Sequence, residues 1–252
     1  MENSGKGSLY FSGTSGIQIP FPKYLFPKEH ESSSRLKFYS TLFNSLEVNS
    51  SFYKLHRAKT YESWSSQVGE DFRFTFKVWK QITHNKNMQF EQHDIVNFMR
   101  SLDLVGNKKG CLLIQFPPST GKENFNQLNY LLDSIRNEKS SHEWKLAVEF
   151  RNSSWYKEDV YELLKSYHAS IVLHDISKSN PPFLSSEEDF IYVRFHGPAG
   201  DYRGSYTEAF LFEYSGYIND WLAEGKTVYV YFNNTAGEAL KNLEELNRMI
   251  IK

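Results

Sequence analysis

Eight short segments in which apolar and polar residues alternate recur along the whole chain, and they constrain its fold more than any other feature. Alternation with a period of two indicates a β-strand with one apolar face. The predicted strands cover residues 9–15, 45–52, 72–78, 111–116, 145–151, 169–175, 190–196 and 227–234. Most of the segments between them have helical spacing, most clearly residues 91–106, 157–168 and 240–250.

Alternating strands and helices predict parallel pairing, because a crossover between parallel strands needs roughly a dozen residues or more. Eight such units in 252 residues fit a closed TIM-type (β/α)8 barrel. We expect a single domain over residues 1–252, because no linker or change of composition divides the chain. Residues 176–189 contain Pro181-Pro182 and little helical pattern, which predicts a loop in place of the sixth helix. Two doubly wound half-domains are the alternative architecture.

Charge and composition set limits on location and partners. The formal net charge is -1, so no overall field selects nucleic acid or an anionic membrane. The single cysteine, Cys111, allows no intrachain disulfide and lies in an apolar run, where a small buried residue is expected. The N-terminus does not look like a secretory signal, and no apolar run approaches the ~20 residues that span a bilayer. We therefore expect a soluble, cytoplasmic protein with no membrane partner.

The polar faces of the predicted strands carry charged residues. If the apolar faces pack against helices, the polar faces point into the barrel, where an unpaired charge is costly to bury. These residues gather at the C-terminal ends of the strands, which is where (β/α)8 enzymes have their active sites. They are Glu47, Asn49, Lys77, Gln115, Glu149, Arg151, His174, Asp175, Arg194, His196, Asn233 and Asn234. His174 and Asp175 are adjacent, so only one of them faces inward, and we favour Asp175.

Seven ordered sequence blocks resemble the signature blocks of the DUF72 family, also called the YecE-like family. The blocks are GTSG, EVNSSFY, FKVWKQITH, QFPPS, EFRNSSWY, YVRFHGPAGDYRGSY and YFNNTAGEAL. The resemblance implies a TIM barrel whose activity is essentially unassigned, and whose fold is similar to the endonuclease IV and sugar isomerase barrels. Two blocks depart from the family pattern: Ile17 follows GTSG where the family usually has Trp, and Ser51 replaces a Thr.

The charged residues allow several kinds of chemistry. Glu149 and Arg151 lie two apart, either as a structural ion pair or as a general base beside an anion-binding guanidinium. Lys77 is a candidate base, Schiff-base nucleophile or phosphate ligand, unless it pairs with Glu47 or Glu149. The loop after the seventh strand frequently binds phosphate in this fold. Its candidate ligands, with the end of the eighth strand, are Arg194, Tyr202, Arg203, Tyr206, Asn233 and Asn234.

The leading hypothesis is an enzyme, a hydrolase or an isomerase, that acts on an anionic substrate such as a phosphorylated sugar or a nucleotide. The predicted catalytic residues are Lys77, Glu149, Asp175 and His196. The predicted binding residues are Glu47, Asn49, Gln115, Arg151, Arg194, Tyr202, Arg203, Tyr206, Asn233 and Asn234.

Two alternatives remain open at this point. One is a metal-dependent phosphodiesterase or nuclease of endonuclease-IV-like design, with Glu149, Asp175 and His196 as ligands. No HExxH, HxH or CxxC spacing supports it, so we assign no metal ligands. The other is a non-catalytic barrel that binds nucleic acid or another ligand by stacking on exposed aromatic residues, namely Tyr53, Trp79, Trp155, Tyr202 and Tyr206. The sequence leaves cofactor and oligomeric state open.

Overall fold

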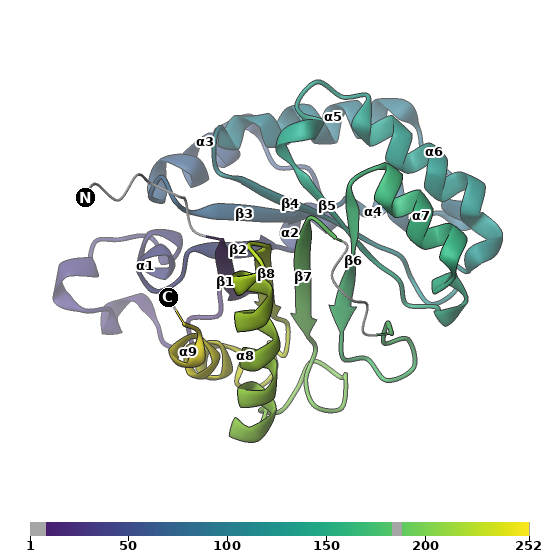
Figure 1. The fold of residues 1–252 in the computed structure, drawn as a ribbon. Helices are drawn as coiled ribbons and strands as arrows, with labels where there is room; N and C mark the ends of the chain where they lie inside the picture. Colours follow the sequence, from purple (N-terminus) through teal and green to yellow (C-terminus); the bar gives the residue numbers. More distant parts are fainter. Residues whose placement is uncertain (1–8, 183–187, 252) are drawn as a thin grey trace, which may run out of the picture.

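The computed structural model describes residues 9–182 and 188–251, and its framework is one sheet of eight parallel strands (Figure 1). The strand order is β1-β8-β7-β6-β5-β4-β3-β2, which is that of a nearly closed TIM-type barrel. The strands are β1 (Tyr10–Thr14), β2 (Ser45–Val48), β3 (Arg73–Lys77), β4 (Lys109–Gln115), β5 (Lys145–Glu149), β6 (Ala169–His174), β7 (Phe190–Phe195) and β8 (Thr227–Phe232).

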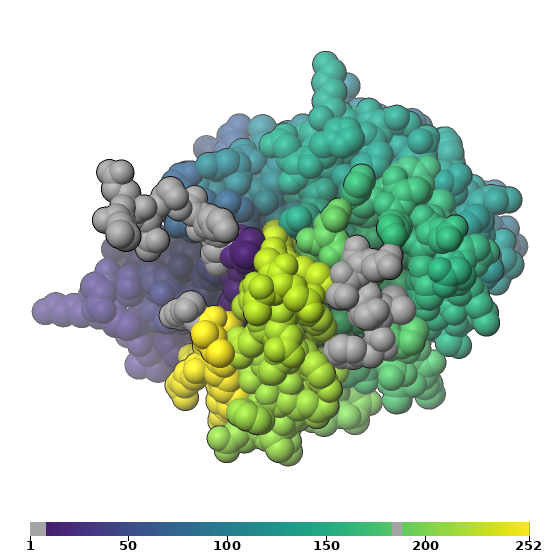
Figure 2. All heavy atoms as spheres, in the orientation of Figure 1, coloured from purple at the N-terminus to yellow at the C-terminus, as the bar shows by residue number. Residues whose placement is uncertain are grey.

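Helices follow most of the strands and cover the outside of the barrel (Figure 1), and the atoms of α8 form part of the surface seen in Figure 2. They are α1 (Arg35–Leu42), α2 (Ser50–Tyr53), α3 (Ala58–Gln67), α4 (Lys80–Thr83), α5 (Gln92–Leu102), α6 (Phe125–Arg136), α7 (Glu158–Ser166), α8 (Glu208–Ala223) and α9 (Ala239–Met249). Between β6 and β7 the described residues contain no helix, as the sequence predicts, and residues 183–187 lie outside the described part. None of the described helices combines the length and apolar character needed to span a bilayer.

The two faces of most strands contribute to two separate apolar clusters. One face, with Phe74, Phe76 and Leu112, packs against the helices, as the alternation predicts. The other face points into the barrel, where a smaller cluster includes Cys111 and Tyr192. Polar side chains occupy the interior positions further along the same strands. The barrel interior is therefore apolar at one end and polar at the C-terminal end.

Side chains close the seam between β1 and β2, where the backbone ladder is reduced to a single bridge between Ser15 and Glu47. The Asn44 amide spans this seam in place of a ladder pair. Its Oδ1 accepts from the Ser12 backbone N–H at 3.0 Å, and its Nδ2 donates to the Tyr10 carbonyl at 2.7 Å. Gly13 lies against the Ser45 carbonyl, and a Cβ at Gly13 would collide with it. The barrel thus closes through an asparagine and through the absence of a side chain at Gly13.

We predict that Asn44→Ala weakens the barrel at this seam. The substitution leaves the Ser12 N–H and the Tyr10 carbonyl without their partners, which costs about 1–3 kcal/mol of unfolding free energy. Asn97→Ala is the matched control, because Asn97 is exposed on α5 and should change stability by no more than about 0.5 kcal/mol. Urea unfolding measures both variants. Equal stability of the two variants would contradict this account of the seam.

Candidate functional site

One buried arginine spans the polar end of the barrel. Arg194 on β7 has only 1% of its surface exposed, and its guanidinium donates to Glu47 on β2 through Nε at 2.9 Å and Nη2 at 2.7 Å. Its Nη1 donates to Glu149 Oε2 on β5. Neither β2 nor β5 is a neighbour of β7 in the sheet. A single side chain therefore ties together three strands that no backbone ladder joins.

Glu47 is held in its ionised form at the base of this network. Its carboxylate accepts from the Ser15 hydroxyl at 2.5 Å and from the Tyr192 hydroxyl at 2.7 Å, besides the two bonds from Arg194. Burial would raise the pKa of Glu47, but the attraction and hydrogen bonds of Arg194 outweigh burial and lower it. Glu47 is fully buried, so its role is to hold Arg194 rather than to meet a ligand.

Glu149 is similarly committed. Burial would raise the pKa of this fully buried carboxyl, but Arg151 and Arg194 hold it well below its usual value. Oε1 accepts from Arg151 Nε and Oε2 from Arg194 Nη1, so both oxygens have guanidinium partners. A carboxylate with so low a pKa is a poor proton acceptor at neutral pH. The geometry therefore gives Glu149 the role of orienting the two arginines.

His196 fills the space between the two guanidinium groups. Its Nε2 lies 3.0 Å from Arg151 Nη2 and 3.2 Å from Arg194 Nη1. A guanidinium can only donate, so Nε2 is the acceptor and the ring proton is on Nδ1, 3.3 Å from Asp175 Oδ1. Burial lowers the pKa of His196 to about 4, so the ring is neutral at pH 7.

Both members of the His174-Asp175 pair support His196 from outside the cavity. Asp175 accepts from the backbone N–H of His196 at 2.8 Å and from the Tyr206 hydroxyl. His174 Nε2 donates to the Phe150 carbonyl at 3.0 Å, and its ring meets that of His196 edge to face. Neither side chain lines the cavity.

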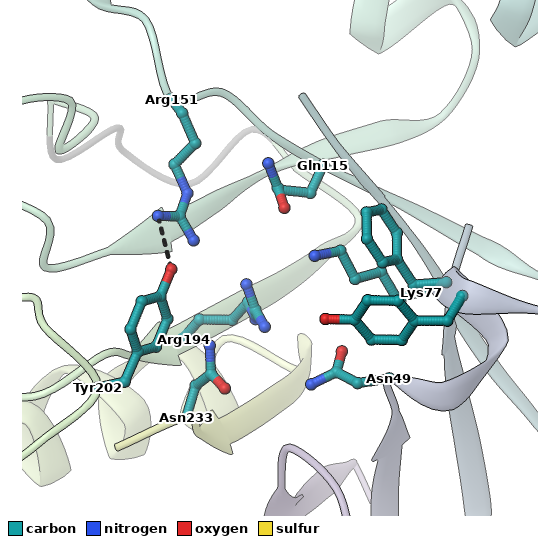
Figure 3. A pocket seen from close by; sticks show the side chains of 9 residues that line it. Asn49, Lys77, Gln115, Arg151, Arg194, Tyr202 and Asn233 are labelled. Carbon is teal, nitrogen blue, oxygen red and sulfur yellow. Dashed lines mark hydrogen bonds between the residues drawn. The ribbon is translucent and has the colours of Figure 1, made fainter. Parts of the chain in front are cut away.

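A cavity of about 180 Å³ opens above this network at the C-terminal end of the strands (Figure 3). Its lining residues are Asn49, Phe52, Tyr53, Lys77, Gln115, Arg151, Arg194, Tyr202 and Asn233. Three of these nine described residues are cationic, and none is acidic. The carboxylates of Glu47 and Glu149 lie in the buried network rather than on this lining. The cavity therefore presents its positive charges to a ligand without intervening carboxylates.

Lys77 is the cation of this cavity without a carboxylate partner among the described residues. Its Nζ lies 4.1 Å from the centre of the Phe52 ring, in a cation–π contact. The salt bridge to Glu47 or Glu149 considered from the sequence does not form, because both carboxylates are bound to arginine. Burial and then the Arg194 charge lower the pKa of Lys77 to about 8. Lys77 is therefore mostly protonated at pH 7, with a minor neutral fraction that grows as the pH approaches 8.

The amide side chains of the cavity offer acceptors to a ligand. Asn49 Oδ1 is buried and has no hydrogen-bond partner among the described residues. Gln115 uses its Nε2 to donate to the Phe116 carbonyl at 2.6 Å, which leaves its Oε1 as an acceptor. An unpartnered buried acceptor is costly, so this wall favours a ligand that donates hydrogen bonds.

Tyr202 reaches the cavity because of an unusual backbone conformation. Its φ is +67°, which non-glycine residues seldom adopt. The loop fixes it by hydrogen bonds from the Tyr202 N–H to the His196 carbonyl at 2.6 Å and from the Ala236 N–H to the Tyr202 carbonyl at 3.0 Å. The Tyr202 hydroxyl then accepts from Arg151 Nη1 at 3.4 Å (Figure 3). Strained backbone of this kind often accompanies a functional position.

The structure brings about half of the predicted site residues to one cavity. Lys77, Asn49, Gln115, Arg151, Arg194, Tyr202 and Asn233 line it. Glu47, Glu149, His196, Asp175 and Tyr206 form the supporting network. Arg203 is exposed and does not line the cavity, and Asn234 is buried, donating to the Gly204 carbonyl and to Asn242.

Nothing in the sequence indicates that Phe52 lines the cavity, and Tyr53 was offered only as a surface for stacking on bases. The period-two pattern predicts a strand through residue 52, but β2 ends at Val48 and the short helix α2 begins at Ser50. This turn places both aromatic rings on the cavity wall. The Ser51 hydroxyl, which donates to the Val48 carbonyl and to the Lys77 carbonyl at 2.7 Å each, fixes α2 against β3.

The donor groups do not fit a metal ion. Within residues 9–182 and 188–251, no group of three or more His, Cys, Asp or Glu is arranged to hold one. Glu149 has both oxygens bound to guanidinium groups, and His196 Nε2 accepts from the same arginines. A cation placed among Glu149, Asp175 and His196 would have to displace two arginine charges.

The fold and the site define a TIM-type barrel protein with a cationic cavity at the C-terminal end of its strands. The chain belongs to the family described as "Protein of unknown function DUF72", whose model matches residues 12–252.

Two curated relatives and one solved structure agree with this assignment. The UPF0759 protein YunF of Bacillus subtilis is 26% identical over 84% of this chain and 85% of its own length. The UPF0759 protein YecE of Escherichia coli is 26% identical over 66% of this chain and 60% of its own length. The crystal structure of the DUF72 family protein TM1631 from Thermotoga maritima superposes with a TM-score of 0.78 at 27% identity, over 96% of this chain and 99% of that chain.

Loss of the central arginine should destabilise the whole barrel. Arg194→Met leaves Glu47 buried with no cation and Glu149 with only Arg151, which costs roughly 3–5 kcal/mol of unfolding free energy. Arg203→Met is the matched control, since Arg203 is exposed, and its cost should stay within about 0.5 kcal/mol. Chemical denaturation of both variants at pH 7 gives the comparison. If Arg194→Met lowers the free energy of unfolding by less than about 1 kcal/mol, the network does not hold the strands together.

Proposed function

We propose that this protein is an enzyme that binds a small phosphorylated sugar in the cavity at the C-terminal end of its barrel. The observation that carries the proposal is the charge of the wall, where Lys77, Arg151 and Arg194 meet and no lining residue among those described is acidic. Glu47 and Glu149 balance the two arginines, so a protonated Lys77 adds an uncompensated positive charge. A concave site of this kind favours an anionic group.

Arg151 is the natural partner for the anionic group of the ligand. Its Nε is committed to Glu149, but Nη1 has only a 3.4 Å contact, to the Tyr202 hydroxyl. The Glu149 and His196 contacts fix the plane of this guanidinium, which lowers the entropy lost when it binds an oxyanion. Glu149, His196 and Asp175 then act as positioning residues behind it.

The amides and the size of the cavity favour a sugar over a nucleic acid. Asn49 and Gln115 offer acceptors that match the hydroxyl groups of a sugar, and about 180 Å³ suits a small molecule. Of the five aromatic residues that the sequence offered for stacking on bases, Tyr53 and Tyr202 line the cavity, whereas Trp79 does not. Trp155 and Tyr206 are buried and do not line it either. Near-zero net charge also weakens the case for a nucleic-acid binder.

Lys77 is the proposed catalytic residue. Its amine lies on the cavity wall, and a pKa of about 8 makes it available both as a proton carrier and as a nucleophile near neutral pH. The reaction class that a reactive lysine favours is rearrangement or cleavage next to a carbonyl group, so the proposal is an isomerase or a lyase rather than a phosphodiesterase.

Glycerol 3-phosphate tests the anion site by isothermal titration calorimetry. Arg151→Met should weaken binding roughly 10- to 100-fold, because it removes a charge-assisted hydrogen bond to the phosphate. Lys77→Met should also weaken binding, because it removes the uncompensated positive charge of the cavity. Lys77→Met breaks no ion pair among the described residues. This variant therefore still tests the anion site if Arg151→Met disturbs the fold. Arg203→Met is the control and should bind like the unmodified protein. Unchanged affinity in the first two variants, or a large loss of affinity in the control, would show that the anion does not bind in this cavity.

A further inference from the structure

Lys77 differs from the other two cations of the cavity in what surrounds its charged group. Arg151 and Arg194 are fixed by carboxylates, whereas Lys77 contacts the face of the Phe52 ring and forms no ion pair among the described residues. Figure 3 shows its amine pointing towards the middle of the cavity, with Arg151 and Tyr202 at the opposite side.

We infer that Lys77 forms a covalent imine with the aldehyde or ketone group of the ligand. This inference rests on the proposed function, because the same cavity must first hold the phosphate group at Arg151. The ligand then spans the cavity, with its phosphate group at Arg151 on one wall and its carbonyl group at Lys77 on the other. The sugar hydroxyl groups in between meet the acceptors of Asn49 and Gln115.

The chemistry of this step balances without an additional reactant. The neutral Nζ attacks the carbonyl carbon, and a proton moves from nitrogen to the carbonyl oxygen to give a carbinolamine. Loss of one water molecule gives the imine, which takes up one proton to become an iminium ion. The iminium withdraws electrons from the adjacent carbon, so that a proton or a carbon fragment leaves more readily. Hydrolysis of the iminium returns Lys77 and the product.

Three features of the site support the neutral amine that this step needs. Burial removes water that would stabilise the ammonium form, and the Arg194 charge disfavours a second cation nearby. Glu47 and Glu149, which would stabilise the ammonium form, are already bound to arginine. The Arg194 network thereby keeps carboxylates away from Lys77 as well as holding the strands.

Dihydroxyacetone phosphate with sodium cyanoborohydride is the direct test, because the reductant converts an iminium into a stable secondary amine. Peptide mass spectrometry of the unmodified protein should find the adduct on Lys77 in preference to other lysines. The yield of the Lys77 adduct should rise as the pH passes through about 8, where Lys77 loses its proton, rather than near 10.5, the pKa of an ordinary lysine. Glycerol 3-phosphate carries the same anion without a carbonyl group, so it should compete with the probe and suppress the adduct.

Matched variants separate the imine from simple anion binding. Lys77→Arg keeps a positive charge but cannot form an imine, so it should still bind glycerol 3-phosphate while losing the adduct. Lys80→Met alters an exposed lysine three residues away and should keep the Lys77 adduct. Binding of glycerol 3-phosphate with no adduct at Lys77, or with labelling spread evenly over surface lysines, would overturn the imine and leave the anion site standing. Absence of binding would overturn both.

Discussion

The double ion pair from Arg194 to Glu47 and Glu149 is the interaction on which the rest of this structure depends. Three charges without access to water are tolerable only when each has a partner, and here every carboxylate oxygen receives at least one hydrogen bond. The network crosses the barrel from β7 to β2 and β5, and so fixes the polar end of an interior whose other end is apolar. The network also fixes the positions of Arg151 and Arg194 on the cavity wall.

The same network determines what the cavity can do. By occupying both carboxylates, Arg194 and Arg151 leave Lys77 without a counter-ion among the described residues, and the remaining wall consists of amides and aromatic rings. The neutral His196 belongs to the same network. Its Nε2 accepts hydrogen bonds from both guanidinium groups, and its Nδ1–H points towards Asp175 Oδ1. Electrostatics within the barrel, rather than overall charge, therefore produces a cationic site in a chain whose net charge is -1.

The sequence predicts much of this arrangement because strand alternation is a local property. Alternate residues of a strand face opposite sides, so Phe74 and Phe76 face the helices when Lys77 faces inward. The same alternation places Glu47, Glu149 and Arg194 together inside the barrel. Local patterns do not reveal which carboxylate an arginine binds across the barrel, so the sequence left Glu149 open between an ion pair with Arg151 and a general base. Loops are harder still: Tyr202 and Arg203 are neighbours, yet only Tyr202, with its positive φ, reaches the cavity.

A crystal structure of the protein soaked with inorganic phosphate tests the central claim most directly. We expect tetrahedral density inside the cavity, within hydrogen-bond distance of Arg151 and facing Lys77, while Glu47 and Glu149 keep their bonds to Arg194. Phosphate bound at the exposed Arg203 with an empty cavity would contradict it, as would a Glu149 that turns away from both arginines to contact Lys77.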